Sequence, residues 1–263
     1  MISIDPQLIK DMIDRERRID NRPLDQYRPI KIERGYVSSA EGSARVRIGD
    51  TEVVAGVKFA VGEPFSDTPN EGVLMVAAEF IPLASPDFES GPPGEDAVEV
   101  ARVVDRAIRE SKVIDFKKLC IKPQEKVWMV FVDVDVLDND GNLIDATSIA
   151  AITALLNAKL PELDENNKID YDKPRTKALQ IAGIPVSITI GKIGSRLFVD
   201  PSLSEEVALD SRLTVGTFNT ENGIMLCSMQ KGGTHGLTSG EIEKMIEMAE
   251  RFGSQVRKLI EES

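Results

Sequence analysis

The chain has 263 residues, of which 41 % are hydrophobic and 29 % charged, ordinary values for a globular protein with a substantial core. A net charge of −12 argues against a protein that binds nucleic acid over its whole surface. The chain has a single histidine, His235, which argues against His-rich metal sites and Ser-His triads. Two distant cysteines, no membrane-length apolar run and an N-terminus without a signal-peptide core predict a cytoplasmic protein that contacts no membrane.

The first half of the chain reads as a helix, several strands, a second helix and a long strand. Residues 5–18 place their apolar side chains on one face of a helix. From Arg28 to Val61 apolar and polar residues alternate between Gly and Asp turns, the pattern of antiparallel strands, and Gly49-Asp50 suits a tight hairpin. The remaining elements predicted here are a strand at 72–82, a helix at 97–115 and a strand at 126–138.

The second half repeats this order. A helix at 147–160 precedes an acidic, proline-containing linker at 161–177, and a final helix from Ser239 to Glu262 has capping-box spacing between Thr238 and Glu241. Strands followed by a helix, twice over, predict an α+β fold whose two halves, residues 1–165 and 166–263, share one core. Four strand-like runs lie between linker and helix, at 184–190, 195–200, 212–219 and 223–229.

One stretch, "FVDVDVLDNDGNLIDATSIAAITALLNA" (131–158), is rich in aspartate. An EF-hand calcium loop is excluded, because two of its required carboxylate positions hold valine and threonine and a strand precedes it. A structural account fits better. Asp133 and Asp135 alternate with valines on a strand, 137–142 forms a turn with Gly141 in a left-handed conformation, and Asp145 is expected to be an N-cap.

Three stretches carry a family resemblance: 17–57, with its Arg-x-Asp-x-Arg-Pro opening, 98–111, and the aspartate-rich stretch itself, supported by "VDPSLSEEVALDSRLTVG". The chain resembles the RNase PH family, and within it the catalytically silent RNase PH-like subunits of archaeal exosomes. The resemblance implies a duplicated βαβα RNase PH-like fold (ribosomal protein S5 domain 2-like). Active members degrade RNA from its 3′ end with phosphate as the nucleophile.

The resemblance also shows where this chain departs from active members. Active relatives have a Gly-Gly-Thr-Arg-like phosphate segment, which matches Gly141–Ile144 here, followed by Asp145. No arginine is present, and Asp145 is expected to occupy the helix N–H groups and repel phosphate. Of two family aspartates six residues apart, the first matches Glu206 and the second Arg212, which cannot act as a base or bind a cation. We therefore expect no catalytic residue, no metal ligand and no cofactor.

The helix around "EVARVVDRAIRES" turns Arg102, Arg106 and Arg109 away from its apolar stripe. Taken alone, this is a solvated face with nearby acids as ion-pair partners. The resemblance implies instead that Arg102 and Arg106, with Arg109 as a less direct match, contact RNA in a channel built with a partner subunit. A guanidinium can hold phosphate through two hydrogen bonds, so arginine suits this role.

Weaker candidates have simpler explanations. Arg45 and Arg47 share a strand face and reach either RNA or Glu52. The loop 230–236 lacks Walker spacing and reads as a turn, with His235 structural. Trp128 is expected in the core.

The first hypothesis for function is therefore a non-catalytic subunit. It would pair with an active RNase PH-like exosome subunit in a hexameric ring that also carries RNA-binding cap subunits, and it would position single-stranded RNA for 3′-to-5′ phosphorolysis. A rival is an independently active phosphate-dependent exoribonuclease that uses Glu206 and Asp210. A third possibility is a purely structural ring element whose arginines are paired with acids.

Overall fold

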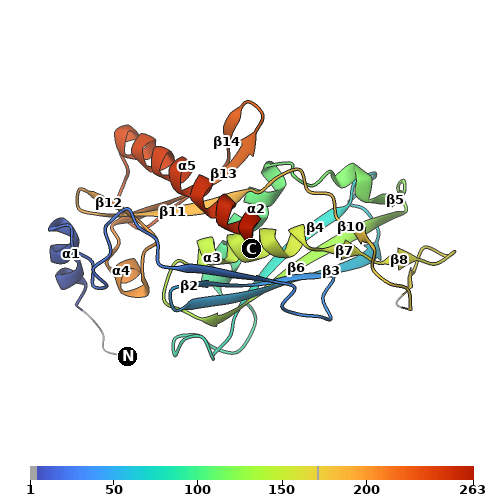
Figure 1. Ribbon diagram of the computed structural model, residues 1–263, viewed down its shortest axis with the longest axis horizontal. Coiled ribbons are helices and arrows are strands. Elements are labelled where there is room, and N and C mark those ends of the chain that lie inside the picture. The colour runs from blue at the N-terminus through green and yellow to red at the C-terminus, as the bar shows by residue number, and fades with distance from the viewer. Residues whose placement is uncertain (1–4, 171) are drawn as a thin grey trace.

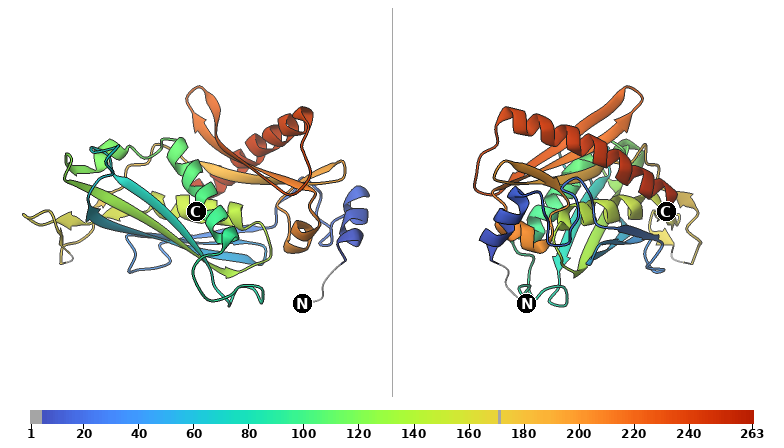
Figure 2. Two further views of the ribbon diagram at one scale, coloured as in Figure 1. Left: turned by 180° about the vertical axis from the view of Figure 1, so that it is seen from behind. Right: turned by 60° about the vertical axis from the view of Figure 1, so that its left-hand side comes forward.

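The computed structural model describes residues 5–170 and 172–263, and these form four stacked layers. A large sheet lies at the base in Figure 1, helices α2 (Glu95–Glu110) and α3 (Leu143–Leu156) rest on it, a smaller sheet covers them, and helix α5 (Ser239–Glu262) lies on top. The views in Figure 2 show the same order from the back and the side. The largest buried cluster draws residues from both halves of the chain, so the predicted α+β fold with a shared core is confirmed.

The large sheet belongs to the first half. Its order is β1-β2-β3-β6-β4, with β5 also paired to β6. All neighbours are antiparallel except β4 and β6, which are parallel and joined through the crossover helix α2. The strands are β1 (Ile30–Arg34), β2 (Gly42–Ile48), β3 (Thr51–Gly62), β4 (Val73–Phe80), β5 (Cys120–Lys122, after the 3-10 turn Phe116–Leu119) and β6 (Lys126–Asp138).

The small sheet belongs to the second half and has the order β12-β11-β13-β14. Its strands are β11 (Val186–Ile193), β12 (Arg196–Val199), β13 (Ser211–Thr220) and β14 (Gly223–Gly232), with the short helix α4 (Leu203–Ala208) between β12 and β13. The linker between the halves contains four two-residue strands, β7 (Lys159–Leu160), β8 (Glu162–Leu163), β9 (Ile169–Asp170) and β10 (Lys177–Ala178).

Helix α3 lies between the two sheets, and this explains its sequence. Every residue from Ile144 to Leu155 is buried, because one side of the helix packs on β2, β3 and β6 and the other on β11. A helix that is covered on all sides is apolar all round and shows no amphipathic stripe.

The turn into α3 requires glycine at one position. Gly141 has φ +84°, and a Cβ there would stand 2.4 Å from the backbone nitrogen of Leu203. The predicted turn with left-handed Gly141 is therefore confirmed, and its close approach brings α4 against the start of α3. The alternation on β6 is confirmed as well, since Asp133 and Asp135 are exposed between buried valines.

Element boundaries differ from the sequence predictions at the helix ends. The helix predicted at 147–160 begins four residues earlier, at Leu143, and the helix predicted at 97–115 spans Glu95–Glu110. Helix α1 covers only Pro6–Asp14 of the predicted 5–18, and α4 was not predicted. The capping box between Thr238 and Glu241 and the buried Trp128 are confirmed. Within the described ranges, no helix has the length and apolar character needed to cross a membrane.

Candidate functional site

The arginine stripe lies on the outer side of α2. The five apolar residues predicted to face the core are all buried: Val100, Val103, Val104, Ala107 and Ile108. Arg102, Arg106 and Arg109 line one groove of about 330 Å³ between α2 and β4, with Met75 on its strand side. The structure therefore brings the three predicted residues together on one surface.

The three guanidinium groups differ in their partners. Arg109 donates to a carboxylate oxygen of Asp105 at 2.7 Å and to the carbonyl of Leu74 at 2.9 Å, so its position is fixed by the fold. Neither Arg102 nor Arg106 forms an ion pair with any residue that the structure describes. If the stripe were purely structural, each of its arginines would be paired with an acid. Among the three, only Arg109 has such a partner.

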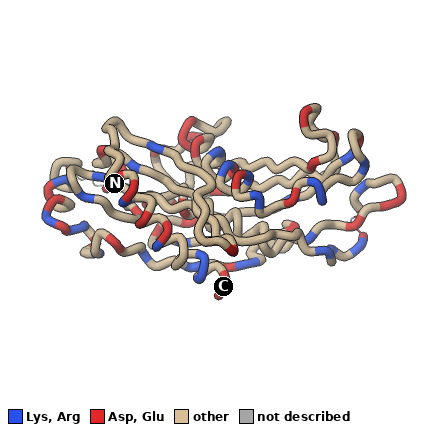
Figure 3. The backbone as a smooth tube through the Cα atoms, turned by 90° about the horizontal axis from the view of Figure 1, so that it is seen from above, with Lys and Arg blue, Asp and Glu red and all other residues tan. Residues whose placement is uncertain are grey.

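These arginines are a local feature. Lys and Arg are interspersed with Asp and Glu along the chain in Figure 3. Arg45 pairs with Glu52 at 2.7 Å, and Arg47 reaches the same carboxylate at 3.3 Å, so these two basic residues neutralise an acid of their own sheet.

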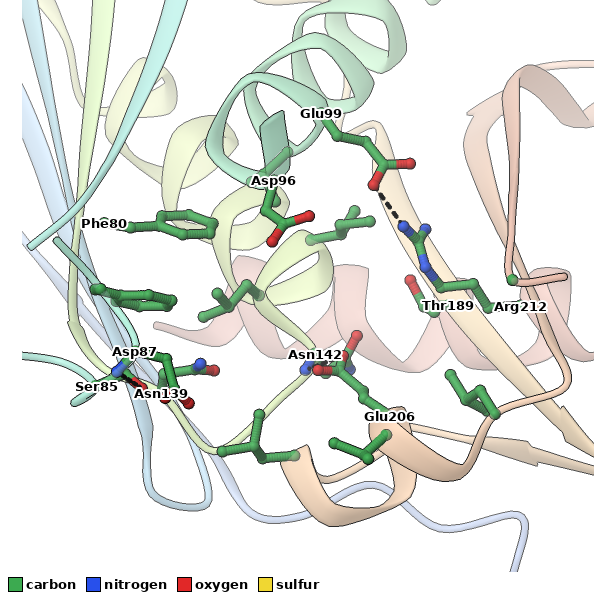
Figure 4. Close-up of a pocket in the computed structure, with 18 residues that line it drawn as sticks. Phe80, Ser85, Asp87, Asp96, Glu99, Asn139, Asn142, Thr189, Glu206 and Arg212 are labelled. Atoms are coloured by element: carbon green, nitrogen blue, oxygen red, sulfur yellow. Dashed lines mark hydrogen bonds and ion pairs between the residues drawn. The ribbon is translucent and has the colours of Figure 1, made fainter. Parts of the chain in front are cut away.

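A larger pocket of about 480 Å³ opens where the two halves meet (Figure 4). It lies between the first turns of α2, the turn from β6 into α3, and the segment from α4 to β13. Four carboxylates and one guanidinium make up its charged lining: Asp87, Asp96, Glu99, Glu206 and Arg212. An anion that enters this pocket meets an excess of negative charge.

Glu206 occupies the amino end of α3 inside this pocket. Its Oε1 accepts a hydrogen bond of 2.8 Å from the backbone N–H of Asn142, the residue that precedes the helix. Burial raises the pKa of Glu206 to about 7, although this hydrogen bond and the charge of Arg212 act in the opposite direction. A helix amino end attracts anions, and here a side chain of the protein itself takes up that place.

Arg212 is neutralised within the pocket. Its Nη2 lies 2.6 Å from Oε2 of Glu99, the pair marked in Figure 4. Oε1 of Glu99 also accepts a hydrogen bond from Gln230 at 3.0 Å, which orients the carboxylate. Arg212 is the only basic residue among the described residues that line the pocket, so its pairing leaves no uncompensated cation there.

Comparison with known proteins identifies the family. Residues 26–161 match the model of the 3′ exoribonuclease family, domain 1, and residues 183–251 match domain 2 of the same family. The chain belongs to the 3′ exoribonuclease (RNase PH) family.

Individual relatives are similar over nearly the whole chain. "Exosome complex component Rrp42" of Methanocella arvoryzae is 48 % identical over 93 % of this chain and 90 % of that protein, and the protein of the same name from Pyrococcus abyssi is 46 % identical over 97 % and 93 %. The structure described as "archaeoglobus fulgidus exosome with RNA bound to the active site" matches with a TM-score of 0.88 and 42 % identity, covering 96 % of each chain. Rice Rrp46, at 19 % identity and a TM-score of 0.69 over 93 % and 98 %, shares the fold.

The segment matched to the family's phosphate site lies at the amino end of α3. The acidic side chain found there is not the one that the sequence predicted. Asp145 is not the N-cap of α3, since the cap position is Asn142 and Asp145 lies inside the first turn, fully buried. Its carboxylate accepts hydrogen bonds from Tyr27 at 2.6 Å and from the hydroxyl of Thr189 at 2.8 Å. The prediction that Asp145 caps α3 was wrong, and the acidic side chain at the amino end of this helix is Glu206.

The alternative acidic pair is not assembled. Asp210 is absent from the described residues that line the pocket around Glu206. Its Oδ1 accepts from Nζ of Lys10 at 2.7 Å and its Oδ2 from the backbone N–H of Gly194, also at 2.7 Å. The hydrogen bond from Lys10 holds the pKa of Asp210 below its usual value, as expected of a carboxylate in an ion pair.

His235 is mostly exposed, and its ring lies 3.9 Å from Asp210. Its backbone N–H donates to the carbonyl of Asp210, so residues 233–236 form a turn that lies against the start of β13. Among the described residues, no three His, Cys, Asp or Glu side chains are arranged to hold a metal ion.

A buried ion network lies beneath the pocket, and no sequence pattern predicted it. Asp200, fully buried, accepts hydrogen bonds from Arg28 at 2.7 and 2.9 Å and from Arg22 at 2.7 Å. Asn142 donates from its Nδ2 to Asp200 at 2.9 Å and to Asp145 at 3.1 Å. Burial opposes ionisation of Asp200, but the hydrogen bonds from Arg28 outweigh it, and the pKa stays below its usual value.

A second buried pair extends this network. Nε of Arg18 donates to Oε1 of Glu205 at 2.8 Å, and both side chains are almost entirely buried. The Arg-x-Asp-x-Arg-Pro opening, the turn before α3 and the segment after β12 therefore meet in one charged cluster. No sequence spacing revealed this, because the partners are up to 187 residues apart.

We expect Glu206→Gln to flatten the dependence of stability on pH. An acid whose pKa is raised in the folded state binds more protons when folded than when unfolded, so stability falls as pH rises from about 4.5 through about 7. Glutamine keeps an acceptor for the N–H of Asn142 and carries no charge. The free energy lost between pH 5 and 8, measured by urea denaturation, should shrink by about 2 kcal/mol in the variant. An unchanged pH profile would contradict a raised pKa at Glu206.

Proposed function

We propose that this protein is a non-catalytic subunit of an archaeal exosome ring that degrades RNA from the 3′ end. The support for exosome membership is the similarity to proteins named exosome complex component Rrp42 along nearly their whole length. The partner would be an active RNase PH-like subunit, paired with this chain in heterodimers that close a hexameric ring in the cytoplasm. RNA-binding cap subunits would complete the assembly.

The proposal that this chain is not catalytic rests on one observation, the arrangement of the charged side chains in the pocket. Phosphorolysis needs a place for inorganic phosphate and a carboxylate for proton transfer or metal binding beside the scissile bond. Here Glu206 accepts the hydrogen bond at the amino end of α3, and Arg212 is paired with Glu99. Phosphate would have to displace Glu206 from the helix end and compete with Glu99 for Arg212. It would have to do so inside a pocket that is already acidic.

The contribution to RNA degradation is binding and positioning. Arg102 and Arg106 present two guanidinium groups that are not neutralised by acids of the described chain, on a groove of about 330 Å³. Two such groups can hold phosphates of single-stranded RNA even on a protein of net negative charge. Arg109 would support this surface through its contacts with Asp105 and Leu74.

Titration of inorganic phosphate into the isolated chain should give no saturable binding. The reason is electrostatic, since four carboxylates surround the one paired guanidinium. Isothermal titration calorimetry up to millimolar phosphate measures this directly, with an active RNase PH-like subunit as the positive control. Stoichiometric binding that disappears in Arg212→Ala would show that the pocket accepts phosphate and would contradict the proposal.

A further inference from the structure

Gln230 joins the pocket to the groove between α2 and β4, which we call the α2 groove. It belongs to β14, which packs against α2. Its Oε1 accepts a hydrogen bond from Nη1 of Arg106 at 3.5 Å, and its Nε2 donates to Oε1 of Glu99 at 3.0 Å. Arg106 lines the α2 groove and Glu99 lines the pocket, so one side chain contacts a residue of each.

Only one orientation of the Gln230 amide satisfies both neighbours. The carboxylate of Glu99 pairs with Arg212 at 2.6 Å (Figure 4). An ionised carboxylate can only accept hydrogen bonds and a guanidinium can only donate them. The amide NH₂ group must therefore face Glu99, which leaves the amide oxygen facing Arg106. Because Arg212 holds Glu99, the acceptor offered to Arg106 has a fixed position.

The contact with Gln230 fixes Arg106 without removing its charge. Arg109, in the same groove, is held by the carboxylate of Asp105 and is neutralised by it. Arg106 is held by a neutral amide, so its positive charge stays available to attract phosphate. A side chain that is already ordered also loses less conformational entropy when it binds a ligand.

We propose that Gln230 is a positioning residue, which orients the guanidinium of Arg106 for RNA and leaves it charged. This rests on the proposed function, in which Arg106 contacts RNA. The paired side chains of the pocket, Glu99 and Arg212, then have a role that needs no catalysis, since they fix the amide of Gln230. At 3.5 Å the hydrogen bond is long, so Arg106 can turn from it toward a phosphate at little cost.

The test is RNA binding by the complex of this chain with an active RNase PH-like subunit. Fluorescence anisotropy with a labelled single-stranded oligoadenylate, in phosphate-free buffer at several salt concentrations, gives the affinity and its salt slope. Gln230→Met keeps the approximate size of the side chain and removes both hydrogen bonds. We expect the affinity to fall about threefold to tenfold, the cost of ordering one long side chain. The salt slope should not change, because Arg106 keeps its charge.

Two further variants separate orientation from charge. Gln230→Glu places a carboxylate beside Arg106, so both the affinity and the salt slope should fall, the slope by about 0.7 as for one lost phosphate contact. In an Arg106→Ala background, Gln230→Met should change the affinity by less than about twofold, because the side chain that it orients is absent.

Gln180→Met is the matched control. The Oε1 of Gln180 also accepts a hydrogen bond from a basic side chain, Nζ of Lys118 at 3.1 Å. Gln180 lies outside the described residues that line the α2 groove and the pocket. The same substitution there should leave RNA affinity unchanged.

The outcomes separate the inference from the proposed function. Unchanged affinity in Gln230→Met overturns the inference and leaves the proposed function standing. An equal loss in the Arg106→Ala background does the same, because Gln230 would then act independently of Arg106. A lower salt slope in Gln230→Met would indicate a lost phosphate contact in place of lost orientation, and also overturns the inference. If Arg106→Ala alone leaves RNA affinity unchanged, the RNA contact of the proposed function fails and the inference fails with it.

Discussion

Replacing Asp200 by asparagine should destabilise the protein by about 3–5 kcal/mol, the usual cost of breaking a buried ion pair from one side. The carboxylate is fully buried and accepts hydrogen bonds from Arg22, Arg28 and Asn142. Asparagine turns one acceptor into a donor and removes the buried carboxylate that Arg22 and Arg28 share, so each guanidinium keeps only a more exposed acid, Asp20 and Asp140 respectively. We expect a fall in melting temperature of roughly 10 °C, measured by calorimetry.

Asp200→Asn removes the charge of the side chain without changing the backbone conformation. Asp200 has φ +51°, a left-handed conformation that asparagine tolerates as well as aspartate does. Asp25→Asn is the matched control, since Asp25 pairs with Arg251 at 3.4 Å on the surface and should contribute less than about 1 kcal/mol. The depressed pKa of Asp200 adds a pH signature: its stabilisation is complete above the unfolded pKa and is lost as pH falls below about 4. A loss under about 1 kcal/mol for Asp200→Asn would contradict the network.

Replacing both Arg102 and Arg106 by alanine should weaken RNA binding by the assembled complex by about tenfold to a hundredfold. These guanidinium groups face the α2 groove without an acid partner in the described chain, so their loss removes phosphate contacts and leaves the core intact. For single-stranded RNA, two lost contacts should also lower the slope of log affinity against log salt by about 1.4. Fluorescence anisotropy at several salt concentrations gives both quantities.

Arg251→Ala serves as the control for charge in general. Arg251 lies on α5, is largely exposed and pairs with Asp25, so its removal changes net charge equally per residue without touching the groove. RNA affinity and salt slope that do not change in the double alanine variant would favour the purely structural interpretation of the arginine stripe. A loss of the same size in Arg251→Ala would point to a non-specific charge effect.

The sequence was most informative where a pattern is local. Alternation along β6 predicted which side of the strand holds Asp133 and Asp135, and the apolar stripe of α2 predicted both the buried face and the clustering of Arg102 with Arg106. Each of these follows from a period of two or 3.6 residues within one element. Apolar patterns along the chain predicted the order of the elements and two α+β halves that share one core, the family resemblance agreed with this, and the structure confirms the shared core.

The sequence was least informative where two side chains that interact are far apart along the chain. Helix α3 is apolar on all sides, so its pattern does not show that its buried polar side chains face different neighbours. Asp145 turns to Tyr27 and Thr189, and Glu206 arrives from α4 to accept the hydrogen bond at the helix end. The start of α3 was missed for the same reason, because Leu143 and Ile144 follow a turn and only tertiary packing extends the helix back to them.

The measurement that tests the central claim most directly is RNA degradation with and without phosphate, by this chain alone and mixed with an active RNase PH-like subunit. We expect release of nucleoside diphosphates only from the mixture in the presence of phosphate, because the pocket of this chain has Glu206 at the amino end of α3 and its only guanidinium among the described lining residues paired with Glu99. Phosphate-dependent release by this chain alone, abolished in Glu206→Gln, would contradict the account.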